Sequence, residues 1–167
     1  MTRRDLTLKW IAYLVGLAVI TIFNYNLLSW LPISLPLLLP MAAVAVGTLE
    51  GPKFGAGFGI AIGLVMATVG HRSLICIAVL ALFGWLSGIL TVHALRRDLV
   101  GHIICAVGVM ILWEAWQVGI RLLSHTATFT LLLKVALPEL LWTLIFSFPV
   151  YWVFRFCCVH YGRIYHE

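Results

Sequence analysis

Residues 51–63, GPKFGAGFGIAIG, place Gly51, Gly55, Gly59 and Gly63 at every fourth position of an otherwise apolar stretch. Residues i and i+4 lie on one face of a helix, so this repeat predicts a helix with a smooth groove along one side. In lipid, burial of apolar surface does not drive helices together, whereas small residues let two backbones approach closely. We therefore expect this helix to pack tightly against a neighbour.

The next apolar stretch offers a matching small surface at Gly84 and Gly88, with Ser87 beside them. A contact between these two helices of the same chain is one use of the glycine face. Docking of a separate membrane partner is the other, and the sequence leaves both open. The motif is not a phosphate-binding loop, because the Gly-Lys-Ser/Thr ending and a preceding strand are missing.

Apolar stretches of this kind fill nearly all of the 167 residues, of which 63% are hydrophobic and 10% charged, with a mean hydropathy of +1.08. Soluble domains have about 25% charged residues, and a bilayer core is crossed by about 20 apolar residues in a helix. The sequence thus predicts an all-α integral membrane protein, a single domain over 1–167 built as a bundle of six transmembrane helices. The expected spans are Lys9–Trp30, Ile33–Leu49, Phe54–Val69, Ser73–Leu95, Leu99–Leu123 and Phe129–Phe154.

The second and third spans are short and contain Pro or Gly, so a five-span topology with these two as a re-entrant pair is the main alternative. A β-barrel is disfavoured, because barrel strands alternate in polarity and are only about 10 residues long.

The positive residues predict the orientation. Cytoplasmic loops accumulate Lys and Arg, and six spans with an inner N-terminus put eight such residues inside and three outside. Both termini are then cytoplasmic in a multi-pass protein. The inner set is Arg3, Arg4, Lys9, Lys53, Arg96, Arg97, Arg155 and Arg163, and the outer set is Arg72, Arg121 and Lys134.

The net charge of +5 does not indicate nucleic-acid binding, because the positive residues are spread over inner loops and match anionic lipid instead. The four cysteines and six histidines show no metal-binding spacing. No cofactor or metal is therefore expected. The absence of HExxH and Gly-x-Ser-x-Gly motifs argues against an enzyme.

Charged and polar residues inside the fifth and sixth spans are the candidate site. A charge within the bilayer costs at least about 2.5 kcal/mol on insertion scales, so it should face protein or water and have a partner. Glu114, Gln117 and Arg121 share one helix face, and Arg121 and Lys134 are the candidate partners of Glu114. The full set is Trp113, Glu114, Trp116, Gln117, Arg121, Lys134 and Glu139. A buried polar network, a site for a ligand or partner, and a proton or ion pathway are all compatible with it.

The stretch from Pro36 to Leu95 resembles the rod shape-determining protein MreD family. It contains Pro36 followed by three leucines, then Glu50-Gly51-Pro52, a glycine-rich helix ending at Gly63-Leu64, and the basic pair Arg96 and Arg97 after the next helix. Glu114, and Pro138 followed by Pro149 and Tyr151, are similar to later parts of the family. The Asp that family members place shortly after the Gly-Leu is missing from residues 65–68, VMAT.

This resemblance implies a non-enzymatic scaffold in the bacterial cytoplasmic membrane, acting in cell elongation and peptidoglycan synthesis. The implied partners are a bitopic MreC-like protein and the elongation synthases. The family's fold is similar to that of the substrate-binding subunits of energy-coupling-factor vitamin transporters, which supplies the alternative function. Under that alternative, Glu114, Gln117, Arg121, Lys134 and Glu139 would line a solute pocket.

Overall fold

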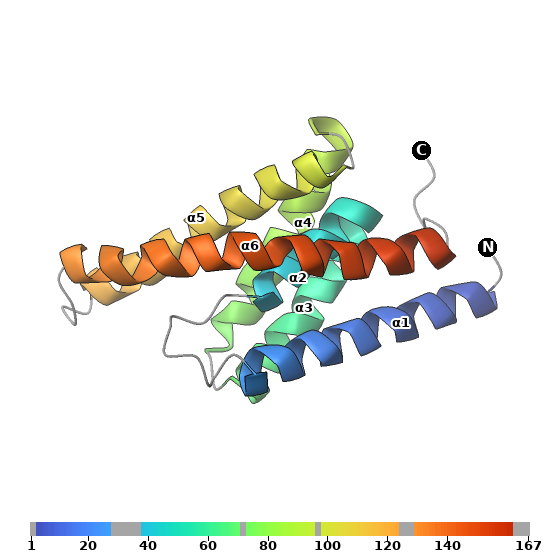
Figure 1. Ribbon diagram of the computed structural model, residues 1–167, viewed down its shortest axis with the longest axis horizontal. Helices are drawn as coiled ribbons and strands as arrows, with labels where there is room; N and C mark the ends of the chain where they lie inside the picture. Colours follow the sequence, from blue (N-terminus) through green and yellow to red (C-terminus); the bar gives the residue numbers. More distant parts are fainter. Residues whose placement is uncertain (1–2, 28–37, 71–72, 96–97, 124–128, 162–167) are drawn as a thin grey trace.

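The computed structural model describes residues 3–27, 38–70, 73–95, 98–123 and 129–161, and these are helical almost throughout (Figure 1). No strand occurs in these ranges. The end of the first predicted span and the start of the second, and the basic residues Arg72, Arg96, Arg97 and Arg163, lie outside them. The elements are α1 (Arg3–Ile22), η1 (Phe23–Leu27, a π-helical turn), α2 (Leu38–Glu50), α3 (Pro52–Thr68), α4 (Ile75–His93), α5 (Leu99–Leu123) and α6 (Phe129–Tyr161).

Four of these helices, α1, α4, α5 and α6, are long and apolar enough to cross a membrane. The 13 residues of α2 and 17 of α3 reach only about 20 and 26 Å at ~1.5 Å per residue, against a bilayer core of ~30 Å. The fold is therefore that of a helical membrane protein with four long apolar helices. The number of six spans stays a prediction.

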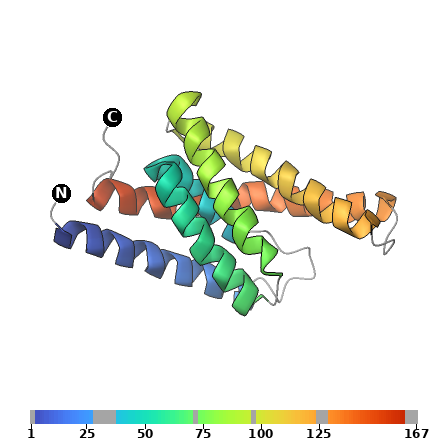
Figure 2. The ribbon, with the colours of Figure 1, turned by 180° about the vertical axis from the view of Figure 1, so that it is seen from behind.

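The core of the protein is α2, every residue of which is buried. It contacts α3 and α4 on one side and α6 on the other, with α1 and α5 also touching it. Figures 1 and 2 show the result from opposite sides: α6 passes in front of α2 in one view, and α3 and α4 cover it in the other. The side chains of this short helix therefore contact other helices of the protein rather than lipid.

A single residue, Gly51, connects α2 to α3. Its φ of 96° lies in the left-handed region that glycine adopts without a Cβ clash. Its N–H donates to the carbonyl of Gly47 at 3.0 Å, which closes the end of α2. Pro52 then begins α3, where its missing N–H removes no helical hydrogen bond. The Gly51-Pro52 pair thus folds α2 and α3 into a tight helical hairpin.

The glycine face of α3 lies against α4, which runs antiparallel to it. Added Cβ atoms at Gly55 and Gly59 would overlap the backbone of Gly84 and Leu80, and one at Gly63 would lie 2.5 Å from the Cα of Ile77. At the hairpin end, Gly88 of α4 fits against Pro52. The glycines predicted as a packing surface therefore sit at backbone-to-backbone contacts within the chain.

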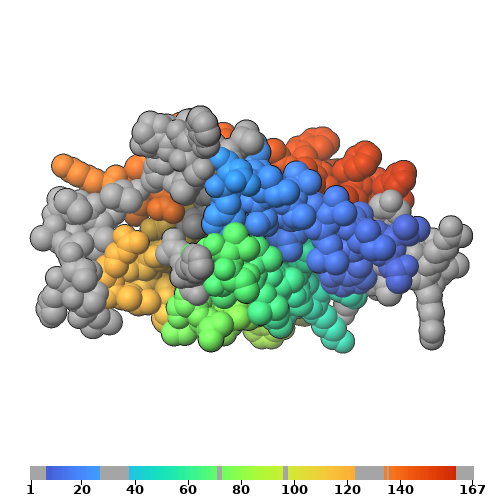
Figure 3. Space-filling view, turned by 90° about the horizontal axis from the view of Figure 1, so that it is seen from below, coloured from blue at the N-terminus to red at the C-terminus, as the bar shows by residue number. Residues whose placement is uncertain are grey.

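The longest helix, α6, continues through Pro138 and Pro149. It packs beside α1 in the opposite direction, so the first turn of α1 and the last turn of α6 lie at the same end of the molecule (Figure 1). Figure 3 shows α1, in blue, at the surface of the molecule beside green segments of α3 and α4. Large apolar side chains on α1 are more than half exposed, which suits contact with lipid: Ile11, Leu14, Val15, Val19 and Ile22.

The contact between α3 and α4 makes Gly59→Ala destabilising. The new Cβ must displace the α4 backbone at Leu80, and overpacking of this kind costs about 1–3 kcal/mol. Gly57→Ala is the matched control, because a Cβ at Gly57 meets nothing within 4 Å. Thermal unfolding in detergent should show a lower midpoint for Gly59→Ala and an unchanged or higher one for Gly57→Ala. Equal midpoints would place the face of Gly59 toward lipid.

Candidate functional site

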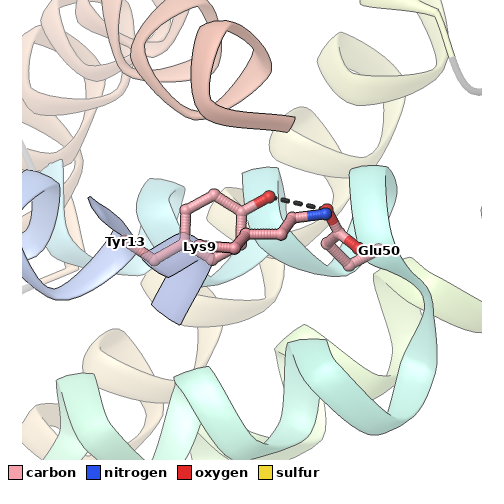
Figure 4. A network of polar contacts seen from close by, with 3 residues as sticks. All are labelled: Lys9, Tyr13 and Glu50. Carbon is pink, nitrogen blue, oxygen red and sulfur yellow. Dashed lines mark hydrogen bonds and ion pairs between the residues drawn. The ribbon is translucent and has the colours of Figure 1, made fainter. Parts of the chain in front are cut away.

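A buried ion pair joins α1 to the end of α2 (Figure 4). Lys9 and Tyr13 lie one helical turn apart on α1, and both point at Glu50, the last residue of α2. The ammonium of Lys9 pairs with Oε1 of Glu50, and the Tyr13 hydroxyl donates a hydrogen bond of 2.7 Å to the same oxygen. Lys9 and Glu50 are both 0% exposed and Tyr13 is 1% exposed.

Electrostatics explains why these three groups must occur together. An isolated buried charge is very costly, so a buried carboxylate requires an opposite charge and donors for its remaining lone pairs. Glu50 is also at the C-terminal end of α2, where the helix dipole is negative and a carboxylate is disfavoured. The ammonium of Lys9 offsets both the carboxylate and the helix end. Removing either partner would leave an unpaired charge inside the protein.

Aromatic rings enclose this pair. The ring of Tyr13 meets Phe58 of α3 and Phe154 of α6 edge-to-face, with centroids 6.2 and 5.7 Å apart, and Phe58 and Phe154 lie 5.5 Å from each other. These geometries are favourable for aromatic pairs. Residues from α1, α2, α3 and α6 thus form one cluster, which we call the Lys9–Glu50 clamp: Lys9, Tyr13, Glu50, Phe58 and Phe154.

A second buried polar contact joins α5 to α6. His102 is 1% exposed; its Nε2 lies 2.9 Å from the hydroxyl oxygen of Ser147, and its ring stacks on Tyr151 with centroids 4.8 Å apart. Ser147 and Tyr151 are also one turn apart, on the face of α6 that is turned inward. Buried polar contacts therefore join α5 to α6 as well as α1 to α2.

The predicted α5 residues lie around the contact with α4. Trp113 is 2% exposed and packs edge-to-face on Phe83 of α4, with centroids 6.3 Å apart. A pocket of about 160 Å³ opens beside it, between α5 and the start of α4. The residues lining this pocket, the α4–α5 pocket, are Ser73, Cys76, Trp113, Trp116, Gln117, Ile120 and Arg121.

Glu114 is half-buried on α5 but does not line this pocket. One of its carboxylate oxygens is buried without a hydrogen-bond partner among the described residues. Arg121 is seven residues, or two turns, further along α5 and so lies on the same helix face. Of the two candidate partners, Arg121 is thus on the same helix as Glu114, whereas Lys134 is on α6.

The α6 residues of the predicted set lie elsewhere. Lys134 is exposed, and Glu139 is half-buried, with its backbone carbonyl accepting a hydrogen bond of 2.6 Å from the Thr143 hydroxyl. Neither side chain lines the α4–α5 pocket. The structure therefore brings Trp113, Trp116, Gln117 and Arg121 together, and leaves Lys134 and Glu139 outside that group.

Sequence reasoning missed the Lys9–Glu50 clamp. Lys9 was counted among the cytoplasmic charges, and Glu50 was noted only as the start of the Glu-Gly-Pro turn. A usable indication was present: each is a single charge next to a long apolar segment, and such charges usually pair with one another.

Comparisons with known protein families, with curated proteins and with solved structures gave no match. Among the described residues, no group of three or more His, Cys, Asp or Glu side chains is placed to hold a metal ion.

Removal of the buried charge at Lys9 should be severely destabilising. Lys9→Met leaves the Glu50 carboxylate buried and unpaired, which costs about 3–5 kcal/mol. Adding Glu50→Gln should recover most of this loss, because the amide is neutral and its oxygen still accepts from Tyr13. The measurement is a double-mutant cycle of denaturation midpoints in detergent.

Lys53→Met serves as the control, since Lys53 is exposed on α3 and the substitution removes the same charge. Additive effects of Lys9→Met and Glu50→Gln, with no recovery in the double variant, would mean that the two side chains do not interact.

Proposed function

We propose that this chain is a non-enzymatic scaffold subunit of the bacterial cell-elongation machinery. In this proposal it crosses the cytoplasmic membrane six times with both termini in the cytoplasm. It binds a bitopic MreC-type protein and, with that partner, the peptidoglycan synthases of elongation. The resemblance of Pro36–Leu95 to the MreD family is the sequence basis for this proposal.

The observation that supports a scaffold most directly is the use of the polar interior. The buried groups of Lys9, Tyr13 and Glu50 pair with one another, and Nε2 of His102 pairs with the hydroxyl of Ser147 between α5 and α6. Together with the aromatic contacts of Tyr13, these pairs connect five of the helices. The ion pair joins α1 to α2, the Tyr13 ring joins α1 to α3 and α6, and the His102–Ser147 contact joins α5 to α6. A scaffold needs a rigid arrangement of helices, and paired interior charges provide it.

The orientation is supported by the positions of the chain ends. The start of α1 and the end of α6 share one end of the molecule, as expected for an even number of crossings (Figure 1). The guanidinium of Arg155, near that end of α6, lies 5.9 and 5.7 Å from the ring centres of Tyr151 and Trp152. Arg and aromatic side chains of this kind are typical of a membrane interface.

The surface proposed for a partner helix is on α5. Gly108, Ala115 and Gly119 lie on one face of this helix, because they are spaced by seven and four residues. A Cβ at Gly108 or Gly119 would meet nothing within 4 Å, in contrast to Gly55, Gly59 and Gly63 of α3, against which α4 packs. Such a face admits the close approach of a second transmembrane helix.

The alternative function, a solute-binding subunit of a vitamin transporter, is supported by the α4–α5 pocket, which includes Gln117 and Arg121. The positions of Lys134 and Glu139 outside that pocket weigh against a single site built from all five predicted residues.

The test is affinity purification of the tagged chain from its native membrane in mild detergent, followed by mass spectrometry. We expect an MreC-type protein and elongation synthases to be recovered. Gly108→Leu with Gly119→Leu should reduce their recovery about tenfold, because the added side chains block a close helix contact. Gly57→Leu is the control, since Gly57 is equally open but lies on α3.

Recovery of a transporter scaffold with paired ATPases would replace this proposal by the alternative. Normal recovery of the elongation proteins with the double leucine variant would retain the function but remove the α5 face from it.

A further inference from the structure

One residue that lines the α4–α5 pocket, Trp113, has a buried hydrogen-bond donor without a partner among the described residues. The indole nitrogen of Trp113 is buried and has no acceptor within the described part of the chain. The ring is held in place by its contact with Phe83 and is 2% exposed. An indole N–H can only donate, and buried polar groups in native proteins almost always have a partner. The pocket is therefore suited to a ligand that brings an acceptor.

The other side chains of the pocket indicate what else the ligand contains. Arg121 contributes a positive charge, and Gln117 and Ser73 contribute further polar groups. The indole ring of Trp116 and the side chain of Ile120, each close to half exposed, form an apolar side of the same pocket. A ligand that matches this wall has an oxyanion at one end and an apolar body at the other.

The position and size of the pocket fit such a molecule. Arg121 is in the last turn of α5, so the pocket lies near the end of a membrane-crossing helix, where Trp and Arg side chains meet lipid head groups. Its volume of about 160 Å³ exceeds that of several water molecules, at ~30 Å³ each in the liquid. It can hold a phosphate-sized group together with part of an apolar chain.

We propose that the α4–α5 pocket binds the oxyanion head group of a membrane amphiphile. In this arrangement the Trp113 N–H donates to an oxyanion oxygen, Arg121 supplies the opposite charge, and the apolar chain leaves the pocket along Trp116 and Ile120. The binding site does not depend on the proposed role in cell elongation.

The test is native mass spectrometry of the full chain in a neutral detergent, titrated separately with three probes. These are a short-chain phosphatidic acid, the diacylglycerol of the same chain length, and inorganic phosphate. We expect saturable binding of the phosphatidic acid and at least about tenfold weaker binding of the other two probes. The diacylglycerol lacks the charge, and inorganic phosphate lacks the apolar body.

Two variants test the assignment to this pocket. Trp113→Phe keeps a ring and removes the N–H, and Arg121→Gln removes the charge at an exposed position. Each should weaken binding of the phosphatidic acid about tenfold, as expected for loss of a hydrogen bond or ion pair to a charged group. Trp142→Phe, on the partly exposed surface of α6, is the control and should bind normally.

Equal binding of the phosphatidic acid and the diacylglycerol would overturn the proposal, as would normal binding by both Trp113→Phe and Arg121→Gln. Inorganic phosphate binding as tightly as the phosphatidic acid would show that the apolar body is not recognised and would overturn the amphiphile assignment. If Trp113→Phe fails to fold, the Arg121→Gln result alone decides the outcome.

Discussion

The enclosure of α2 is the constraint on which the other features of this fold depend. A helix buried on all sides must end somewhere inside the protein, and α2 ends at Glu50, a carboxylate at the negative end of a helix dipole. That charge can be kept only with a cation and a donor beside it, and Lys9 and Tyr13 of α1 supply both. The pairing fixes α1 against the hairpin of α2 and α3, and the rings of Phe58 and Phe154 exclude water around it.

Small residues make the enclosure possible. Gly51 permits a one-residue reversal between α2 and α3, and the glycines that follow allow α4 to approach within backbone contact. Because apolar burial gains little in lipid, such close packing and a few interior polar contacts provide the stability of the bundle. The same residue type has a different consequence on α5, where the faces of Gly108 and Gly119 are left open. The interior glycines explain the fold, and the exterior ones motivate the proposed partner surface.

Polar groups, like the glycines, differ between the interior of the bundle and its periphery. The interior pairs connect helices, whereas the α4–α5 pocket near the end of α5 combines a positive charge, apolar walls and a tryptophan whose indole N–H has no acceptor in the described chain. A membrane scaffold requires a rigid interior and a surface with open binding sites, because its partners and lipids bind at the outside. This distribution connects the proposed function with the proposed amphiphile site while leaving each open to a separate test.

The sequence by itself determined the helices, because a helix in lipid satisfies its own backbone and its apolar length is a local property. The expected spans Leu99–Leu123 and Ser73–Leu95 correspond closely to α5 and α4, and the glycine spacing pointed to the face of α3 on which Gly55 and Gly59 lie. Only the tertiary structure decided which charges meet. Tyr13 and Glu50 are 37 residues apart. Lys134 and Arg121 were both candidate partners of Glu114, but only Arg121 lines the α4–α5 pocket. Which charged side chains pair depends on how the helices rotate and cross in three dimensions, and no local sequence pattern predicts this.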